Sequence, residues 1–124
     1  MIDKLKELVN GDAALVRRGQ WFSADMLMEI GEARHIVKIR SGRIEAIESA
    51  DLLAIDYDFA IRAPLEAWEE FWTPVPKPRH HDVMALIREG KMRIEGDLEK
   101  MLANMLTLKL MLEKPRQLTK GGGE

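Results

Sequence analysis

The sequence ALIREGKMRIEGD occupies residues 85–97 and joins three predicted elements. Apolar residues recur at helical spacing over residues 80–88, and Gly90 ends this helix because glycine accepts the positive φ common after a helix. Apolar and charged residues alternate over 91–95, which predicts a short strand. Gly96 leaves room where the strand meets the next element, and Asp97 is the natural N-cap of a long helix over 98–113.

The predicted helix 98–113 has more apolar surface than one face of a sheet requires. Its apolar residues are Leu98, Met101, Leu102, Met105, Leu106, Leu108, Leu110, Met111 and Leu112. Four of the eight methionines lie at 92, 101, 105 and 111, with Met84 nearby, and such unbranched, polarizable side chains tolerate neighbours of variable shape. This surface suits a cavity with changing contents. An ordinary core or a dimer interface is the more common explanation of such a pattern taken alone.

Upstream of this segment, the spacing of apolar residues predicts a helix followed by an antiparallel meander. The elements are a helix over 2–17 that Asn10-Gly11-Asp12 interrupts, and strands over about 24–31, 35–40 and 43–49. Ser41-Gly42 joins the last two strands with the residues of a tight hairpin turn.

The clearest alternation covers residues 53–62 and predicts a fourth strand. Leu53, Ile55, Tyr57, Phe59 and Ile61 share one face, while Asp56, Asp58 and Arg62 lie on the other, so one face of the sheet is expected to be buried and one wet. Pro64 then opens a short helix over 65–72. Residues 73–78 contain three prolines and predict a semi-rigid connector.

Three large rings lie on the predicted helix 65–72, at Trp68, Phe71 and Trp72. Rings at this spacing are most often core anchors. The alternative is that they form the wall at the mouth of a pocket, and composition does not separate the two roles.

Length and composition restrict the class of protein. A chain of 124 residues is the size of one domain, and we expect a single domain over 1–118 with a flexible tail over 119–124. The formal net charge of −2, without a basic run, argues against nucleic-acid binding. The sequence has no cysteine, no window of about 20 apolar residues and no apolar signal-peptide core. A soluble cytoplasmic protein is expected.

The residues capable of catalysis or metal binding form no recognisable constellation. His35 stands apart from the adjacent His80-His81-Asp82, whose side chains would point in different directions at a helix start. Asp56 and Asp58 share a face, but on a wet strand face they are more simply solubilising charge. We therefore expect no metal and no cofactor.

Residues 85–97, with the apolar helix after them, resemble the Gly-Lys-apolar-x-apolar-x-Gly-Asp signature of the sterol carrier protein type two (sterol transfer) domain family. Residues 54–61, with 64–68 after them, look like the fourth strand and the following helix of that family. The resemblance covers 51–112, and within 1–50 only the hairpin at 37–42 fits. It implies an α+β fold with a five-stranded, largely antiparallel sheet, helices packed on one face and an apolar tunnel between the layers.

The resemblance also implies a function, namely non-catalytic binding and transfer or presentation of a fatty acid, acyl-CoA, sterol or phospholipid. The residues expected to contact the lipid are Trp68, Phe71, Trp72, Met84, Ile87, Met92, Met101, Leu102, Met105 and Leu108. Transient contact with a membrane and a homodimer are further expected partnerships, and the basic C-terminus, with Lys109, Lys114, Arg116 and Lys120, suits an anionic surface.

Two other functions stay open at the level of sequence. The first is an interaction module of the same fold, whose own side chains fill the cavity and which dimerises or assists another enzyme. The second is a small enzyme that uses His81 and Asp82, or the Asp56 and Asp58 pair.

Overall fold

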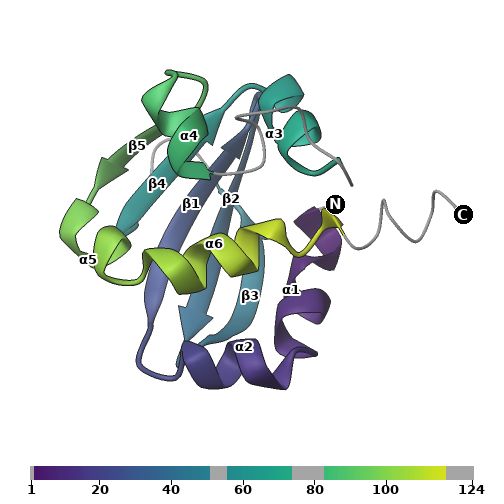
Figure 1. Cartoon of the computed structure of the whole chain (residues 1–124), viewed down its shortest axis with the longest axis vertical. Helices are drawn as coiled ribbons and strands as arrows, with labels where there is room; N and C mark the ends of the chain where they lie inside the picture. The colour runs from purple at the N-terminus through teal and green to yellow at the C-terminus, as the bar shows by residue number, and fades with distance from the viewer. Residues whose placement is uncertain (1, 51–55, 74–82, 117–124) are drawn as a thin grey trace, which may run out of the picture.

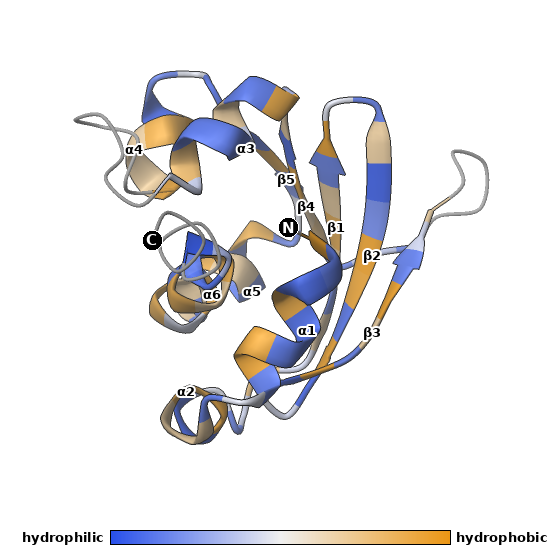
Figure 2. Ribbon diagram, turned by 90° about the vertical axis from the view of Figure 1, so that its right-hand side faces the viewer, coloured by the Kyte–Doolittle hydropathy of each residue, from blue (hydrophilic) through white to orange (hydrophobic). Residues whose placement is uncertain are grey.

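The computed structural model describes residues 2–50, 56–73 and 83–116, and it contains one five-stranded sheet with helices on one face (Figures 1 and 2). The helices are α1 (Ile2–Asn10), α2 (Ala13–Arg18), α3 (Leu65–Phe71), α4 (Val83–Arg88), α5 (Leu98–Ala103) and α6 (Met105–Glu113). The strands are β1 (Ala24–Ile30), β2 (Ala33–Arg40), β3 (Arg43–Ser49), β4 (Phe59–Ala63) and β5 (Arg93–Gly96), in the order β3-β2-β1-β4-β5. The α+β fold class expected from the sequence is confirmed.

Strands β1, β2 and β3 form the predicted antiparallel meander. Their pairing is antiparallel throughout, with Met26 opposite Val37 and Val37 opposite Ile47. Ser41 and Gly42 both have positive φ, at 52° and 82°, as a two-residue turn of this kind requires. The hairpin turn was therefore readable from two residues.

Strand β4 is shorter than the alternation over 53–62 predicts. It begins at Phe59 and runs parallel to β1, with Met26 opposite Phe59, while residues 51–55 lie outside the described part of the chain. The parallel pairing makes the sheet mixed. Phe59 and Ile61 are buried as expected, but Ala60 is buried as well, opposite the equally buried Leu27. Neither Ala60 nor Leu27 belongs to the core cluster under the helices. The outer face of the sheet, which was expected to be exposed to solvent, therefore also contains buried side chains.

The segment 85–97 folds as its residues predict. Gly90 follows α4 with a φ of 77°, and the backbone amides of Lys91 and Met92 donate to the Leu86 carbonyl. Gly96 has a φ of 98°, and a Cβ there would lie 2.6 Å from the Asp58 carbonyl oxygen. The Asp97 carboxylate accepts a hydrogen bond of 3.0 Å from the Lys100 amide, which is the expected N-cap.

The single helix predicted over 98–113 is wrong, because the chain breaks at Asn104 into α5 and α6. Asn104 has a φ of −118°, and its side-chain amide donates to the Lys100 carbonyl over 2.9 Å. Short polar side chains that bond to nearby backbone groups compete with helix continuation. An apolar pattern alone does not register such a break.

The N-terminal helices α1 and α2 confirm the interrupted helix predicted over 2–17. Asp12 caps α2 by accepting from the Leu15 amide. Asn10 ends α1, and its side-chain amide pairs with both the backbone N–H and the carbonyl of Ile44. It thereby occupies part of the free edge of β3, where an unpaired strand invites another chain.

Candidate functional site

Helix α3 places two of the three predicted rings in the core, and the third follows directly after it. The Trp68 and Phe71 ring centroids lie 6.2 Å apart in an edge-to-face arrangement, and those of Trp68 and Trp72 lie 5.2 Å apart. All three side chains are almost completely buried. They form one cluster, as their helical spacing predicts.

Hydrogen bonds fix the two indole rings to different elements. The Trp68 Nε1 donates to the Glu29 carbonyl of β1 over 2.9 Å, and the Trp72 Nε1 donates to the Leu112 carbonyl of α6 over 2.8 Å. The Arg116 guanidinium lies 4.5 Å from the centre of the Phe71 ring. Helix α3 is therefore held to the sheet and to α6, so these rings form a fixed part of the interior.

The interior beside this cluster is rich in methionine. Met92 and Met101 are buried in the core cluster, together with Leu108 of α6. Ile87 and Met105 are partly buried and pack against it. With the three rings, eight of the ten residues expected to contact lipid therefore belong to this core or pack against it. The other two are Met84, which is partly buried on α4, and Leu102.

Three further methionines lie in the same core, and the sequence-based selection of lining residues omitted them. They are Met26 and Met28 of β1 and Met111 of α6. The sequence pattern predicts burial for each of them, since Met26 and Met28 alternate along a strand and Met111 lies in the apolar helix. What the sequence did not reveal is that β1 is the central strand, which brings its inward face beneath α6.

Leu102 lies elsewhere, because 52% of its surface is exposed on α5. Leu98 and Leu106 are also exposed, at 39% and 56%. Helices α5 and α6 therefore bury one apolar side, with Met101 and Leu108, and present a second to solvent. The surplus of apolar surface predicted for residues 98–113 is present in the structure.

Two large open grooves lie on the described surface, and none of the ten expected residues lines either. One, of about 800 Å³, lies beside α3 and the start of β5, between charged side chains that include Glu29, Arg62 and Lys91. The other, of about 720 Å³, lies between α2 and the end of α6, with Leu15 and Leu110 in its lining. The core side chains described above lie between the sheet and the helices.

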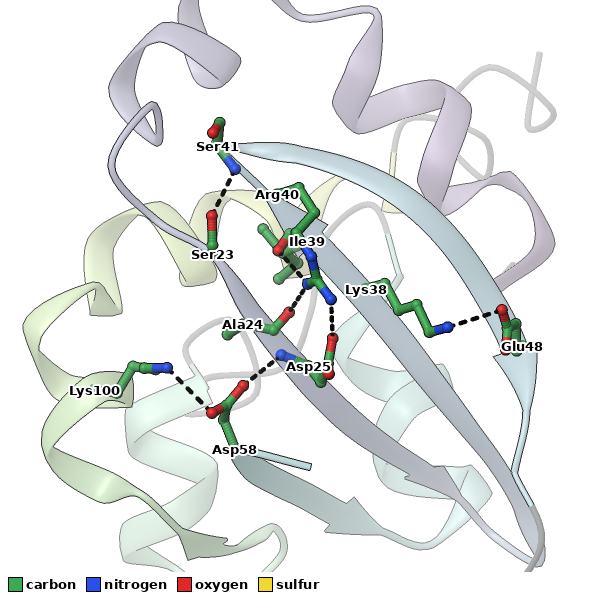
Figure 3. A network of polar contacts seen from close by, with 10 residues as sticks. All are labelled: Ser23, Ala24, Asp25, Lys38, Ile39, Arg40, Ser41, Glu48, Asp58 and Lys100. Atoms are coloured by element: carbon green, nitrogen blue, oxygen red, sulfur yellow. Dashed lines mark hydrogen bonds and ion pairs between the residues drawn. The ribbon is translucent and has the colours of Figure 1, made fainter. Parts of the chain in front are cut away.

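Asp58 holds the beginning of β4 in place (Figure 3). One carboxylate oxygen accepts from the Asp25 backbone amide over 2.7 Å, and the other accepts from Lys100 Nζ over 3.1 Å. The bond from the Asp25 amide, followed by that from Lys100, holds the pKa of the Asp58 carboxyl below its usual value of 3.8. Asp58 is therefore a structural residue, and the interpretation of it as solubilising charge is wrong. Asp56 is exposed as expected.

The other residues that the sequence offered for catalysis or metal binding are not gathered at one site. His35 is partly buried on β2, and burial lowers its pKa. His80, His81 and Asp82 lie outside the described residues. Within residues 2–50, 56–73 and 83–116, no three metal-ligating side chains gather at one point. In the same ranges, no helix has the length and apolar character needed to cross a bilayer.

Comparison with solved structures decides the fold. A crystal structure of sterol carrier protein 2 superposes with a TM-score of 0.75 at 10% identity, over 92% of this chain and 92% of that chain. The chain has the sterol carrier protein 2 fold. A conserved hypothetical protein of Thermus thermophilus, described as possibly a sterol carrier protein, shares this fold, with a TM-score of 0.72 at 10% identity over 91% of this chain and 82% of that one.

A third structure, the UbiJ-SCP2 ubiquinone synthesis protein, has the sterol carrier protein 2 fold with a TM-score of 0.59 at 15% identity, over 91% of this chain and 85% of that one. No protein-family model matches the sequence, and no curated protein matches it. The likeness to the sterol carrier fold therefore lies in the three-dimensional structure.

Proposed function

We propose that the protein binds one apolar ligand between the sheet and helices α4, α5 and α6, and transfers or presents it without catalysis. The ligand classes proposed are a fatty acid, an acyl-CoA, a sterol or a phospholipid. The observation that carries the proposal is a core with five buried methionines, Met26, Met28, Met92, Met101 and Met111, within the sterol carrier protein 2 fold.

Methionine gives this interior the capacity to change its packing. Its side chain has three rotatable bonds and no branch, so it fills irregular space in several ways. Among the described elements, the backbone of α4 makes fewer close approaches to its neighbours than the backbone of α1 makes to β3, although Val83 and Leu86 of α4 are buried. Regions with few tertiary contacts open at lower free energy than the rest of a domain. An apolar ligand would enter beside α4 and displace methionine side chains.

The residues proposed to contact the ligand have different roles. Met92, Met101, Met105 and Leu108 would line the tunnel, together with Met84 and Ile87 of α4. The ring cluster of Trp68, Phe71 and Trp72 would form its rigid wall, because its indole N–H groups are already bonded. Leu102 is half exposed and would contact only the part of the ligand that emerges.

Such a site would bind reversibly. Burial of about ten to fifteen methylene groups contributes about 8–12 kcal/mol at about 0.8 kcal/mol each. Association costs at least about 4 kcal/mol. The difference corresponds to dissociation constants between about millimolar and about micromolar. A carrier needs affinity in this range because it has to release its ligand.

A matched pair of variants on α6 tests the proposal. Met105 is partly buried against the core, whereas the neighbouring Leu106 is 56% exposed. Met105→Trp should fill the ligand space and weaken binding of a fluorescent fatty acid about tenfold or more, with a smaller effect on Tm. Leu106→Trp should leave binding within about twofold of the wild-type value.

Two results would contradict the carrier function. If the wild-type protein binds no fatty acid, acyl-CoA or sterol probe and sediments as a tight dimer, the interaction module with a filled core is the better account. If Met105→Trp lowers binding and Tm in equal measure, Met105 is a plain core residue and the site lies elsewhere.

A further inference from the structure

The described methionines differ in how far solvent can reach them. Five are at most 1% exposed, namely Met26, Met28, Met92, Met101 and Met111. The other two, Met84 on α4 and Met105 on α6, are only partly buried. An oxidant in solution reacts fastest with the thioethers that it can reach. The described methionines therefore divide into a protected group and an accessible pair.

Met105 lies where the accessible surface meets the interior. It is the first residue of α6, directly after the break at Asn104 that separates α6 from α5 (Figure 1). Its side chain packs against the buried core cluster, whereas the next residue, Leu106, is 56% exposed. Within the described part of the chain, Met84 is not among the residues that pack against this cluster. Met105 is therefore the accessible methionine that also contacts the core.

The sulfur of this chain belongs to methionine alone, because the sequence contains no cysteine. A thiolate in the same chain would compete for a peroxide and could form a disulfide. Without one, a hydroperoxide reacts with the sulfur of this protein only at a thioether. The reaction converts a flexible apolar side chain into a polar one, methionine sulfoxide.

We propose that Met105 is an oxidation site at which hydroperoxides control the affinity of the ligand space. This inference rests on the proposed carrier function, since it concerns the regulation of the same site. The Met105 Sδ lone pair attacks the terminal oxygen of the hydroperoxide, so that an S–O bond forms while the O–O bond breaks. The proton of that oxygen passes to the departing oxygen, which leaves as water or, from a lipid hydroperoxide, as an alcohol. Sulfur is oxidised by two electrons and the peroxide is reduced by two.

The sulfoxide would make this part of the ligand space polar. Its oxygen is a hydrogen-bond acceptor, and burial of an acceptor without a donor is unfavourable. The core cluster that Met105 contacts consists of apolar side chains, and the indole N–H groups of Trp68 and Trp72 within it already donate to backbone carbonyls. The oxidised side chain therefore turns toward solvent beside Leu106, and an apolar ligand loses its contact with the thioether.

Peptide mass spectrometry after graded treatment with hydrogen peroxide tests the selectivity. Met101 and Met105 both lie between Lys100 and Lys109, so trypsin releases them in one peptide and fragmentation separates their sulfoxides. Met105 should oxidise at least about tenfold faster than Met101, which is 0% exposed. A second arm uses an equimolar hydroperoxide of an unsaturated fatty acid. Oxidation of Met105 in this arm identifies a bound lipid as the oxidant, and oxidation by hydrogen peroxide alone identifies the solvent as its source.

Binding of a fluorescent fatty acid is measured on the same samples, and each protein is compared with its own untreated sample. Peroxide should weaken binding by the wild type about tenfold, and methionine sulfoxide reductases with a thiol should restore it. Met105→Leu keeps a similar side-chain volume and should lose less than about twofold on the same treatment. Met111→Leu removes a 1% exposed methionine from the same helix and should give no protection.

The proposal is overturned if Met101 and Met105 oxidise at equal rates, or if complete oxidation of Met105 leaves binding unchanged. It is also overturned if Met84→Leu protects binding from peroxide and Met105→Leu does not. An untreated wild-type protein that binds no probe would contradict the carrier function instead. The two oxidation rates are measured without a ligand, so the two failures are distinguishable.

Discussion

Asp58 shows how far the role of a single residue depends on distant pairing. Its carboxylate binds the Asp25 amide of β1, which is 33 residues away, and Lys100 of α5. In the sequence, Asp58 occupies the same kind of position as Asp56, between apolar residues. Only the parallel pairing of β4 with β1 separates the structural aspartate from the exposed one. No local pattern contains that information.

The role of Asp58 predicts an acid dependence of stability. Because the folded pKa lies below the value of 3.8, the unfolded state takes up the proton first as pH falls. The stabilisation is complete above about pH 5 and is lost as pH falls through 3.8 toward the folded pKa. Asp58→Asn should therefore cost about 1 kcal/mol of unfolding free energy at pH 6, and the cost should shrink at pH 3.

Urea unfolding at both pH values measures this dependence, with Asp56→Asn as the matched control. Asp56 is exposed and forms no hydrogen bond or ion pair within the described ranges, so its substitution should matter little at either pH. A constant difference between wild type and Asp58→Asn from pH 6 to pH 3 would show that the charge of Asp58 is not what stabilises β4.

At the scale of elements, the sequence predicts what local chemistry determines. The hairpin at Ser41-Gly42 and the cap at Asp97 both follow from residues within a few positions, and both are present. The start of β4 at Phe59 and the break at Asn104 do not follow, because each depends on which backbone groups have partners elsewhere. Alternation and helical spacing report the faces of elements more reliably than their ends.

The two glycines around β5 give a prediction at this scale. Both have positive φ, which costs an alanine about 1–2 kcal/mol. Nothing lies within 4 Å of a Cβ on Gly90, whereas a Cβ on Gly96 would meet the Asp58 carbonyl oxygen at 2.6 Å. Gly96→Ala should therefore destabilise the fold clearly more than Gly90→Ala, because it also pushes β5 and β4 apart.

Chemical denaturation of the two alanine variants checks this order, and amide hydrogen exchange locates the damage. Faster exchange confined to β4, β5 and α5 in Gly96→Ala is the expected result. Equal losses in both variants would mean that the close contact with Asp58 relaxes freely and that backbone conformation alone makes these glycines necessary.

At the scale of the whole molecule, the helices lie on one face of the sheet and enclose a methionine-rich core (Figure 2). Of the lipid-contact residues that the sequence predicted within 83–112, Leu102 is the exposed one, and Leu98 and Leu106 of the same apolar pattern are exposed as well. Apolar spacing carries no information on how much volume those side chains enclose, since volume depends on the separation of sheet and helices. The fold and much of the apolar layer were thus readable from the sequence, while the ligand space is a property of packing.

The carrier function makes one direct prediction for the intact protein. Purified from cells under mild conditions and examined by native mass spectrometry, it should carry one lipid-sized molecule per chain, or take up one added fatty acid with a saturable stoichiometry of one. Organic extraction should release the bound molecule and leave the protein folded. A protein that emerges without adducts and gains none from fatty acids, acyl-CoA, sterols or phospholipids would contradict a ligand space between the sheet and helices α4, α5 and α6.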